Sequence, residues 1–213
     1  MIELAWWGRV PYAAALERQR AARQAIIEGE GREYIALLEH PSVVTVGRRP
    51  APGTPSASDL RAHGIDFARI ERGGLATWHG PGQLVGYVLV DVGGRGGGVR
   101  RTVDAVEEGI IDWLATRGVA AGRRAGFPGV WVGTGKICAI GLHFKRGVSL
   151  HGFALNLTCD LDGFGRIVPC GITEGGVTAL NLHSPQAPTP MEASWSVGRA
   201  VRARLVDTFR RQR

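Results

Sequence analysis

The chain has 213 residues, of which 44% are hydrophobic and 21% are charged, a balance that excludes a disordered protein. This length favours a single domain over residues 1–213. The net charge of +7 indicates either an acidic partner, such as nucleic acid, a membrane surface or an acidic protein, or an ordinary solvated surface rich in arginine. No stretch is apolar enough for a membrane span or a secretory signal, so we expect a cytoplasmic protein.

The first predicted element is a helix that begins at Pro11 and runs to about Glu28. Proline fits the first position of a helix, and apolar residues recur at helical spacing along one side. That side carries Leu16, Ile26 and Ile27.

Apolar and β-branched runs then predict strands, with turn residues between them. Residues 32–40 and 42–47 form two strands around a turn at Pro41. Residues 48–60 are rich in Pro, Gly and Ser and predict a loop. Residues 83–92 predict a strongly apolar strand that ends at a glycine-rich turn.

A second helix is predicted to begin with Thr102 as its cap, because apolar residues follow at helical spacing. Those residues are Val103, Val106, Ile110 and Trp113. Three short strands follow, at VWVG (130–133), KICAIGLHF (136–144) and LHGFALNLT (150–158).

The last predicted helix covers residues 189–209, where Thr189 and Glu192 form a capping box around Pro190. Its predicted buried stripe is Trp195, Gly198, Val201, Leu205 and Phe209. The whole pattern predicts an α/β fold of the α+β type, with a mixed, largely antiparallel sheet. Alternating βαβ units are missing from the pattern, which argues against a Rossmann sheet.

The segment GTGKICAIG (133–141) superficially resembles a phosphate-binding loop. The motif would need glycine where Val130 stands and Ser or Thr where Ile137 stands, and it would open a helix rather than a strand. Lys136 is one of only two lysines among 26 basic residues. Because a buried lysine can exchange protons near neutral pH whereas arginine cannot, Lys136 is a candidate for proton chemistry.

Three cysteines without a CxxC pair argue against a disulfide framework and against a zinc site. Cys170 lies in RIVPCGI, where the flanking proline and glycine shape a turn that suits a nucleophile. An ammonium ~4 Å from the thiolate would stabilise it by about 4 kcal/mol. Cys170 and Lys136 could therefore form a nucleophile and base pair. Alternatively, Cys170 is a packing residue and Lys136 a surface charge.

A third segment, ERGGLATWHGPGQLVGY (71–87), has more glycines than a turn needs, which suggests backbone close to a ligand. His79 could contact that ligand or relay protons, or it could be structural. HGFALN (151–156) supplies a second His-Gly pair at the start of a strand.

Together these segments resemble the lipoyl(octanoyl) transferase family, also called lipoate biosynthesis protein B. The resemblance also includes EHPSVVTVGRR and covers about residues 35–182. It implies a biotin/lipoate protein ligase-like catalytic domain. It also implies transfer of an octanoyl group from octanoyl-acyl carrier protein to a lysine of lipoyl domains, in 2-oxoacid dehydrogenase complexes and the glycine cleavage H protein. Cys170 would carry the acyl group as a thioester, and Lys136 would lower the pKa of Cys170 and shuttle protons.

The resemblance further implies a substrate site whose small and apolar residues suit an eight-carbon chain. Its residues would be Arg72, Gly73, Gly74, Leu75, Ala76, Thr77, Trp78, His79, Ala139, Ile140, Gly141, Gly152, Phe153 and Ala154. Because the thioester is already activated, no cofactor and no metal are expected. The expected protein is a monomer that binds neither nucleic acid nor membrane.

Cys138 departs from the family pattern, which has alanine at this position. Alternation along a strand would place its side chain on the same face as Lys136, and we expect it to be a packing residue.

Three other functions compete with octanoyl transfer. An ATP-dependent lipoate–protein ligase would share the fold but would not need Cys170. A basic nucleic-acid-binding module would explain the charge and leave the glycine-rich segments without a purpose. A Cys–His hydrolase would use His79 or His151 as its base and water as the acceptor.

Overall fold

The computed structural model describes residues 1–47, 56–70, 76–166 and 176–210. Within these ranges, strands and helices alternate along the chain, and they form two sheets and four α-helices. The helices are α1 (Tyr12–Glu28), α2 (Ala57–Ala62), α3 (Val99–Ala115) and α4 (Pro190–Thr208). The strands are β1 (Glu3–Arg9), β2 (Tyr34–Glu39), β3 (Val43–Val46), β4 (Asp66–Arg69), β5 (Thr77–His79), β6 (Gln83–Leu89), β7 (Gly122–Arg124), β8 (Phe127–Val132), β9 (Gly135–Lys145) and β10 (Val148–Asn156).

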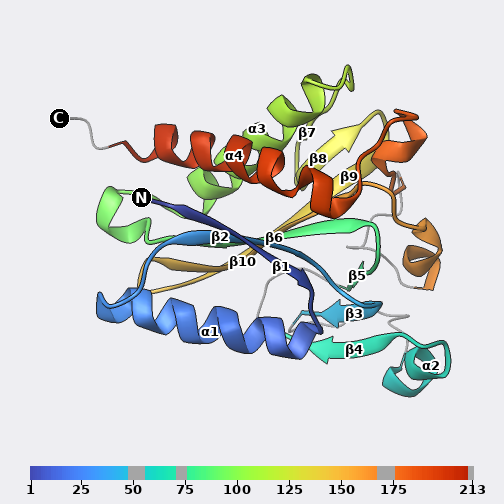
Figure 1. Cartoon of the computed structure of the whole chain (residues 1–213), viewed down its shortest axis with the longest axis horizontal. Helices are drawn as coiled ribbons and strands as arrows, with labels where there is room; N and C mark the ends of the chain where they lie inside the picture. The colour runs from blue at the N-terminus through green and yellow to red at the C-terminus, as the bar shows by residue number, and fades with distance from the viewer. Residues whose placement is uncertain (48–55, 71–75, 167–175, 211–213) are drawn as a thin grey trace.

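The larger sheet has the strand order β1-β2-β6-β10-β9-β8-β7. Strands β1 and β2 are parallel, and every other neighbouring pair is antiparallel. Helix α1 covers one face, whereas α3 and α4 pack together on the other (Figure 1). The predicted mixed, largely antiparallel sheet flanked by helices is thus confirmed.

Coverage of both faces explains why the central strands are apolar without alternation. In β2, Ile35 and Leu37 pack in the cluster that contains the α3 and α4 residues. The intervening Ala36 and Leu38 pack in a separate cluster with Ala15 of α1. Successive side chains of a strand point to opposite faces, so a doubly covered strand must be apolar throughout.

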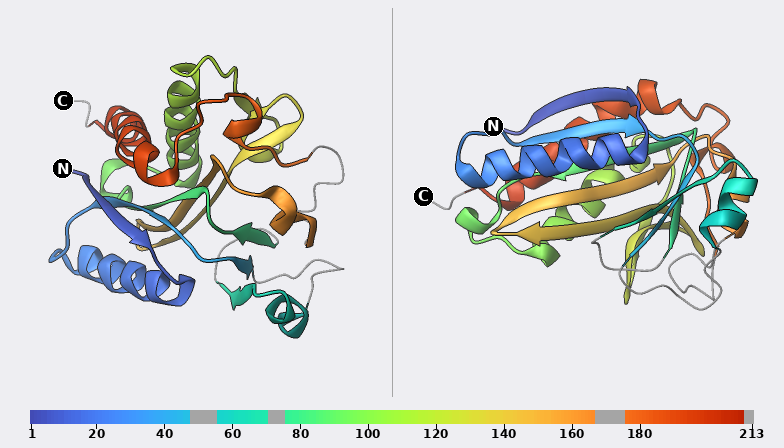
Figure 2. Two further views of the ribbon diagram at one scale, coloured as in Figure 1. Left: turned by 45° about the vertical axis from the view of Figure 1, so that its right-hand side comes forward. Right: turned by 90° about the horizontal axis from the view of Figure 1, so that it is seen from below.

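The second sheet has the order β4-β3-β5 and lies beside one end of the larger one (Figures 1 and 2). Its core contains Val44, Trp78 and Phe164, the last from the short 3-10 helix η2 (Leu161–Arg166). The rings of Trp78 and Phe164 meet edge to face, with centroids 5.3 Å apart.

Several predicted boundaries are wrong. Gly98 rather than Thr102 caps α3, because Thr102 lies one turn inside the helix and donates its hydroxyl hydrogen to the Gly98 carbonyl. The predicted loop 48–60 contains the start of α2, which Ser56 caps by accepting from Asp59 N; residues 48–55 lie outside the described ranges. Strand β1 was not predicted.

Helix α4 begins with the predicted capping box of Thr189 and Glu192. Its buried side contains Gly198, Val201 and Leu205, as expected, but Trp195 is 47% exposed. Viewed along the helix axis at 3.6 residues per turn, Trp195 lies roughly 120° from the buried Val201, beyond the edge of the buried side.

Helix α1 turns a different side to the sheet from the predicted one. Leu16, Ile26 and Ile27 are only partly buried, whereas Gln19 and Arg23 are buried. The Gln19 side-chain oxygen accepts from the backbone N–H of His151, and Arg23 donates to His143 Nδ1 at 3.0 Å.

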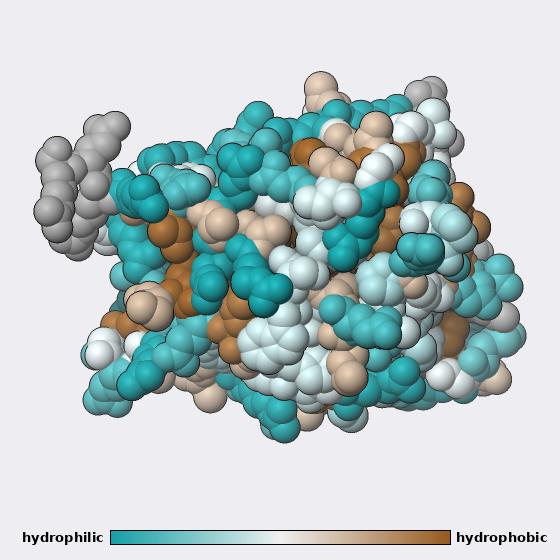
Figure 3. All heavy atoms as spheres, turned by 45° about the horizontal axis from the view of Figure 1, so that its top comes forward, coloured by the Kyte–Doolittle hydropathy of each residue, from teal (hydrophilic) through white to brown (hydrophobic). Residues whose placement is uncertain are grey.

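The face over α3 and α4 is mainly hydrophilic, with apolar residues interspersed (Figure 3). In the parts of the chain that the structure describes, none of the helices has the length and apolar character needed to cross a membrane.

Candidate active site

A pocket opens between the two sheets and the start of α1, with about 500 Å³ of space when the open solvent at its mouth is included. Eight residues of the expected substrate site line it: Thr77, His79, Ala139, Ile140, Gly141, Gly152, Phe153 and Ala154. The lining is predominantly apolar, so the pocket can hold a hydrocarbon chain.

The paired strands β9 and β10 of the larger sheet supply most of this lining. Gly152 pairs with Gly141, and Ala154 pairs with Ala139, across β10 and β9. A Cβ atom on Gly152 would lie 2.0 Å from the carbonyl oxygen of Gly86, so only glycine permits the observed spacing of β10 and β6. Small side chains on these strands leave the space that the pocket occupies.

Lys136 lies on β9, three residues before the pocket residue Ala139, and is buried. Its Nζ donates to the carbonyl oxygen of Pro128 at 3.0 Å and lies 5.0 Å from the centre of the Trp131 ring. The aromatic face attracts the ammonium. A Cβ on Gly129 would lie 2.5 Å from the Cys138 carbonyl oxygen, so the backbone of β9 requires glycine here, whereas its 3.4 Å distance to the lysine stem would be ordinary contact.

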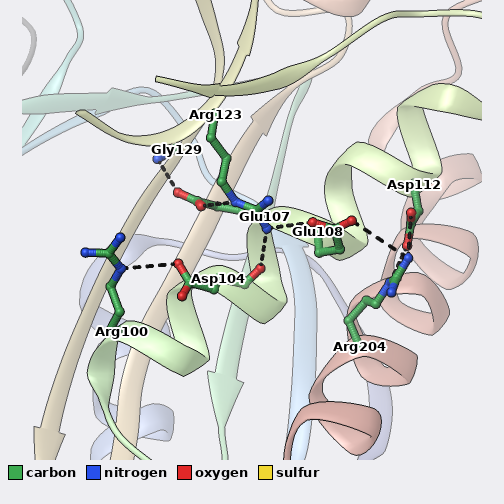
Figure 4. Close-up of polar contacts among 8 residues, drawn as sticks. All are labelled: Arg100, Asp104, Glu107, Glu108, Asp112, Arg123, Gly129 and Arg204. Carbon is green, nitrogen blue, oxygen red and sulfur yellow. Dashed lines mark hydrogen bonds and ion pairs between the residues drawn. The ribbon is translucent and has the colours of Figure 1, made fainter. Parts of the chain in front are cut away.

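A carboxylate from α3 fixes the position of the Pro128 carbonyl. Glu107 is 4% exposed and accepts from the N–H of Gly129 at 2.8 Å and from Arg123 Nε at 2.8 Å (Figure 4). Gly129 directly follows Pro128, so Glu107 holds the peptide that orients Lys136.

His79 lies at the pocket edge, and its Nδ1 is 2.7 Å from Gln83 Oε1. The glycines between them have reasons other than ligand contact. A Cβ on Gly80 would lie 2.1 Å from the Trp78 ring, and one on Gly82, which has φ +82, would lie 2.5 Å from Cys159 N. For these two glycines the close approach is to the protein's own chain.

His40 is buried behind His79, and the centres of the two rings are 5.9 Å apart. Its Nδ1 donates to the Val10 carbonyl at 2.6 Å, so its Nε2 accepts from the Tyr87 hydroxyl at 2.6 Å. Burial lowers the pKa of His40 to about 4, more than the bond to Val10 raises it. Burial raises the pKa of Tyr87, which therefore stays a hydrogen-bond donor.

The structure places two expected substrate-site residues elsewhere. Trp78 lies in the core of the second sheet and donates to Ser42 Oγ, and Ala76 packs in the same core. Cys170 and the segment 72–75, with Arg72, Gly73, Gly74 and Leu75, lie outside the described residues.

The described residues on either side of 167–175 are attached to the candidate site. Before this segment, η2 packs on Trp78 of β5 through Phe164. After it, the Gly176 carbonyl accepts from Lys136 N at 2.9 Å, and Thr178 N donates to Lys136 O at 3.1 Å.

Cys138 is fully buried in the core cluster, next to the equally buried Ile137. The β8–β9 register shifts between Val130 and Trp131, so simple alternation does not relate Cys138 to Lys136. Burial raises the pKa of its thiol, more than neighbouring groups lower it. A buried, protonated thiol agrees with the expected packing role.

Sequence reasoning did not assign four pocket residues: Tyr12, Ile70, Val85 and Tyr87. Val85 and Tyr87 lie in the segment 71–87, but their apolar strand context is typical of core residues, and the sequence gives no signal for Tyr12 and Ile70. His151 also lines the pocket, and it has a left-handed backbone with φ +66. Within the described residues, no group of three or more His, Cys, Asp and Glu side chains is arranged to hold a metal ion.

The fold defines the class of protein. Over 98% of this chain and 84% of the other, it superposes with a TM-score of 0.64 and 18% identity on a structure from Thermoplasma acidophilum. That structure is described as a bi-partite lipoate protein ligase and its E2 lipoyl domain. Biotin protein ligase from Aquifex aeolicus matches with a TM-score of 0.57 and 12% identity, over 98% of this chain and 72% of that one. The chain therefore has the catalytic-domain fold of lipoate and biotin protein ligases.

Sequence comparison then narrows the class. Residues 11–201 match the lipoyl protein ligase A/B catalytic domain, and the chain belongs to that family. The octanoyltransferase of Solibacter usitatus is 46% identical over 169 residues, which are 78% of this chain and 77% of the relative. Further relatives at 41–44% identity carry the same name. The chain is therefore an acyltransferase, and its relatives support octanoyl transfer in lipoylation.

Proposed function

We propose that this protein transfers an octanoyl group from octanoyl-acyl carrier protein to the target lysine of lipoyl domains, through a thioester on Cys170. The observation that carries the proposal is the apolar pocket, which eight expected substrate-site residues line on strands that include the strand of Lys136. An octanoyl chain is apolar and unbranched, so it gains free energy by leaving water for such a lining.

In the first step, the Cys170 thiolate attacks the carbonyl carbon of the octanoyl thioester. A new carbon–sulfur bond forms, and the bond to the carrier sulfur breaks. The carrier thiolate leaves with a proton from Lys136, whose ammonium becomes a neutral amine. A lysine suits this role because its ammonium can give up a proton, whereas a guanidinium cannot.

In the second step, the neutral amine of the target lysine attacks the Cys170 thioester. The amide bond forms, the Cys170 thiolate leaves, and Lys136 accepts the proton that the nitrogen loses. The ammonium–thiolate pair is thereby restored, and no ATP is consumed because the thioester supplies the activation.

The other two cysteines are poor nucleophiles, which supports Cys170. Cys138 and Cys159 are buried, and burial raises the pKa of each thiol above its ordinary value. The anchoring of Gly176 and Thr178 to the backbone of Lys136 also supports the pairing, since Cys170 precedes Gly176 by only six residues.

The test is an intact-mass measurement after incubation with octanoyl-acyl carrier protein in the absence of ATP. The wild type should gain one octanoyl group and lose it when a lipoyl domain is added. Cys170→Ala should gain none, whereas Cys138→Ala and Cys159→Ala should still be acylated. Lys136→Arg keeps the charge but cannot shuttle protons, so its acylation should be about 10²–10⁴-fold slower.

Acylation of Cys170→Ala at the wild-type rate would refute the covalent intermediate. Modification of the lipoyl domain only with ATP and free octanoic acid would instead identify a ligase. Release of octanoic acid into water without transfer to lysine would identify a hydrolase.

A further inference from the structure

Two buried amides connect the pocket to the strand of Lys136. Gln83 and Asn156 are register partners across β6 and β10 and are 1% and 4% exposed. Gln83 Oε1 lies 2.7 Å from His79 Nδ1, and Gln83 Nε2 donates to Asn156 Oδ1 at 2.9 Å. Asn156 Nδ2 in turn donates to the backbone carbonyl of Thr178 at 2.9 Å.

The chemistry of each partner determines which group donates in these hydrogen bonds. A backbone carbonyl can only accept, so Thr178 O fixes which side of the Asn156 amide carries its NH2 group. Asn156 then presents its oxygen to Gln83, and Gln83 must donate through Nε2. A second acceptor, the Trp78 carbonyl at 3.4 Å, favours the same orientation of Gln83.

The fixed orientation of Gln83 determines the state of the His79 ring. Because Gln83 Oε1 can only accept, His79 Nδ1 must carry a hydrogen. In the neutral ring the other nitrogen, Nε2, then has a lone pair and acts as a base. The amide chain thus selects one of two tautomers.

The other end of this series of hydrogen bonds is at Lys136. Thr178 N donates to the Lys136 carbonyl at 3.1 Å, and Thr178 O accepts from Asn156. Hydrogen bonds and the backbone of Thr178 therefore link the backbone of Lys136 to the ring of His79. A substitution of Gln83 or Asn156 should therefore change the hydrogen bonding of His79 at the pocket edge.

We propose that Gln83 and Asn156 are positioning residues that hold His79 as the Nδ1–H tautomer, which makes Nε2 a proton acceptor for the incoming lysine. A lysine side chain has a pKa of about 10.4 and arrives as an ammonium, which cannot attack a thioester. His79 Nε2 takes the first proton and releases it to solvent. Lys136 takes the second as the amide forms. This assignment of the proton acceptor rests on the proposed octanoyl transfer.

The tautomer can be measured directly on the full chain labelled with ¹⁵N-histidine, because the nitrogen shifts of an imidazole distinguish N–H from bare nitrogen. His79→Gln identifies the signal of His79. The wild type near pH 8 should show a protonated Nδ1 and an unprotonated Nε2. Gln83→Met removes the acceptor at similar volume and should lose this pattern. Gln83→Glu restores an acceptor and should keep it.

A wild-type spectrum with hydrogen on Nε2 would overturn the proposal, whether or not any variant folds. An unchanged His79 signal in folded Gln83→Met would overturn it too. Neither result depends on octanoyl transfer, so failure of the proposed function and failure of the tautomer assignment are distinguishable.

The kinetic consequence is measured on the second step, by mixing preformed acyl-enzyme with a lipoyl domain across a range of pH. Gln83→Met should slow this step about tenfold or more, within the 10²–10⁴-fold contribution of general base catalysis. Gln83→Glu should retain most of the rate, with the low-pH limb of its profile moved to higher pH, because a carboxylate favours the protonated ring. Identical profiles for all three proteins would contradict a role in proton transfer.

Discussion

Two neutral groups contact the side chain of Lys136. The Pro128 carbonyl accepts from its ammonium, and the Trp131 ring lies 5.0 Å away. Neither of these two contacts carries a negative charge, so neither competes with a thiolate for the ammonium. Gly129 follows Pro128 directly and packs closely against the Cys138 carbonyl of β9, so it sets the position of the Pro128 carbonyl.

We expect Gly129→Ala to destabilise the protein and to slow acylation. The added Cβ would lie 2.5 Å from the Cys138 carbonyl, so β8 must move away from β9 and carry Pro128 with it. Overpacking of this kind costs about 1–3 kcal/mol, beyond the backbone strain of a positive φ.

Gly126→Ala is the matched control for Gly129→Ala. Gly126 also has a positive φ, +80, but its added Cβ would meet nothing within 4 Å. Urea unfolding should therefore show a larger loss of unfolding free energy for Gly129→Ala. Equal losses in the two variants would mean that contact with β9 is unimportant.

At the scale of elements, α3 links parts of the fold that are distant in sequence. Glu107 connects it to β7 and β8, and Asp112 connects it to α4 through Arg204 (Figure 4). The two connections differ in burial, because the Glu107 side chain is 6% exposed and those of Asp112 and Arg204 are each 42% exposed. Water therefore screens the second connection more than the first, in which the carboxylate is buried although Arg123 is 42% exposed.

This difference predicts unequal costs within one network. Arg204→Ala should reduce the free energy of unfolding by less than about 1 kcal/mol, as exposed ion pairs usually do. Glu107→Ala should cost about 1–3 kcal/mol, because the buried Gly129 N–H loses its acceptor, whereas the half-exposed Arg123 keeps Glu108 as a partner. Chemical denaturation of both variants checks this order, and a larger effect for Arg204→Ala would disprove it.

An element could be predicted where a local sequence pattern determines it, and could not where distant residues do. The capping box of α4 and the doubly covered strands β2 and β6 are local patterns, and they were predicted correctly. The buried side of α1 was not, because Gln19 and Arg23 are buried only through partners on β9 and β10. No local pattern shows that a distant strand will supply such partners.

At the scale of the whole molecule, the pocket joins residues that are far apart in the chain. Its wall includes Tyr12 at the start of α1 and Ile70 after β4, which only the packing of the second sheet against the first brings together. The contiguous runs 139–141 and 152–154 could be predicted because each belongs to one motif. Tyr12 and Ile70 could not, since their role exists only in three dimensions.

His40 makes the stability of the fold sensitive to pH. It joins Val10, before α1, to Tyr87 of β6, and burial lowers its pKa. Its pKa is about 4 in the folded protein, against the ordinary histidine value of 6.5 that applies to the unfolded chain. Between these values the unfolded chain binds more protons. Stability is therefore complete above pH 6.5 and falls as the pH drops towards 4, by on the order of 3 kcal/mol in total. His40→Gln should remove this contribution, whereas the exposed His63→Gln should not. Unfolding free energies measured from pH 4 to 8 check this through the slope, which is independent of any constant loss of stability in the variant. Parallel curves for wild type and His40→Gln would show that His40 is not held neutral by the fold.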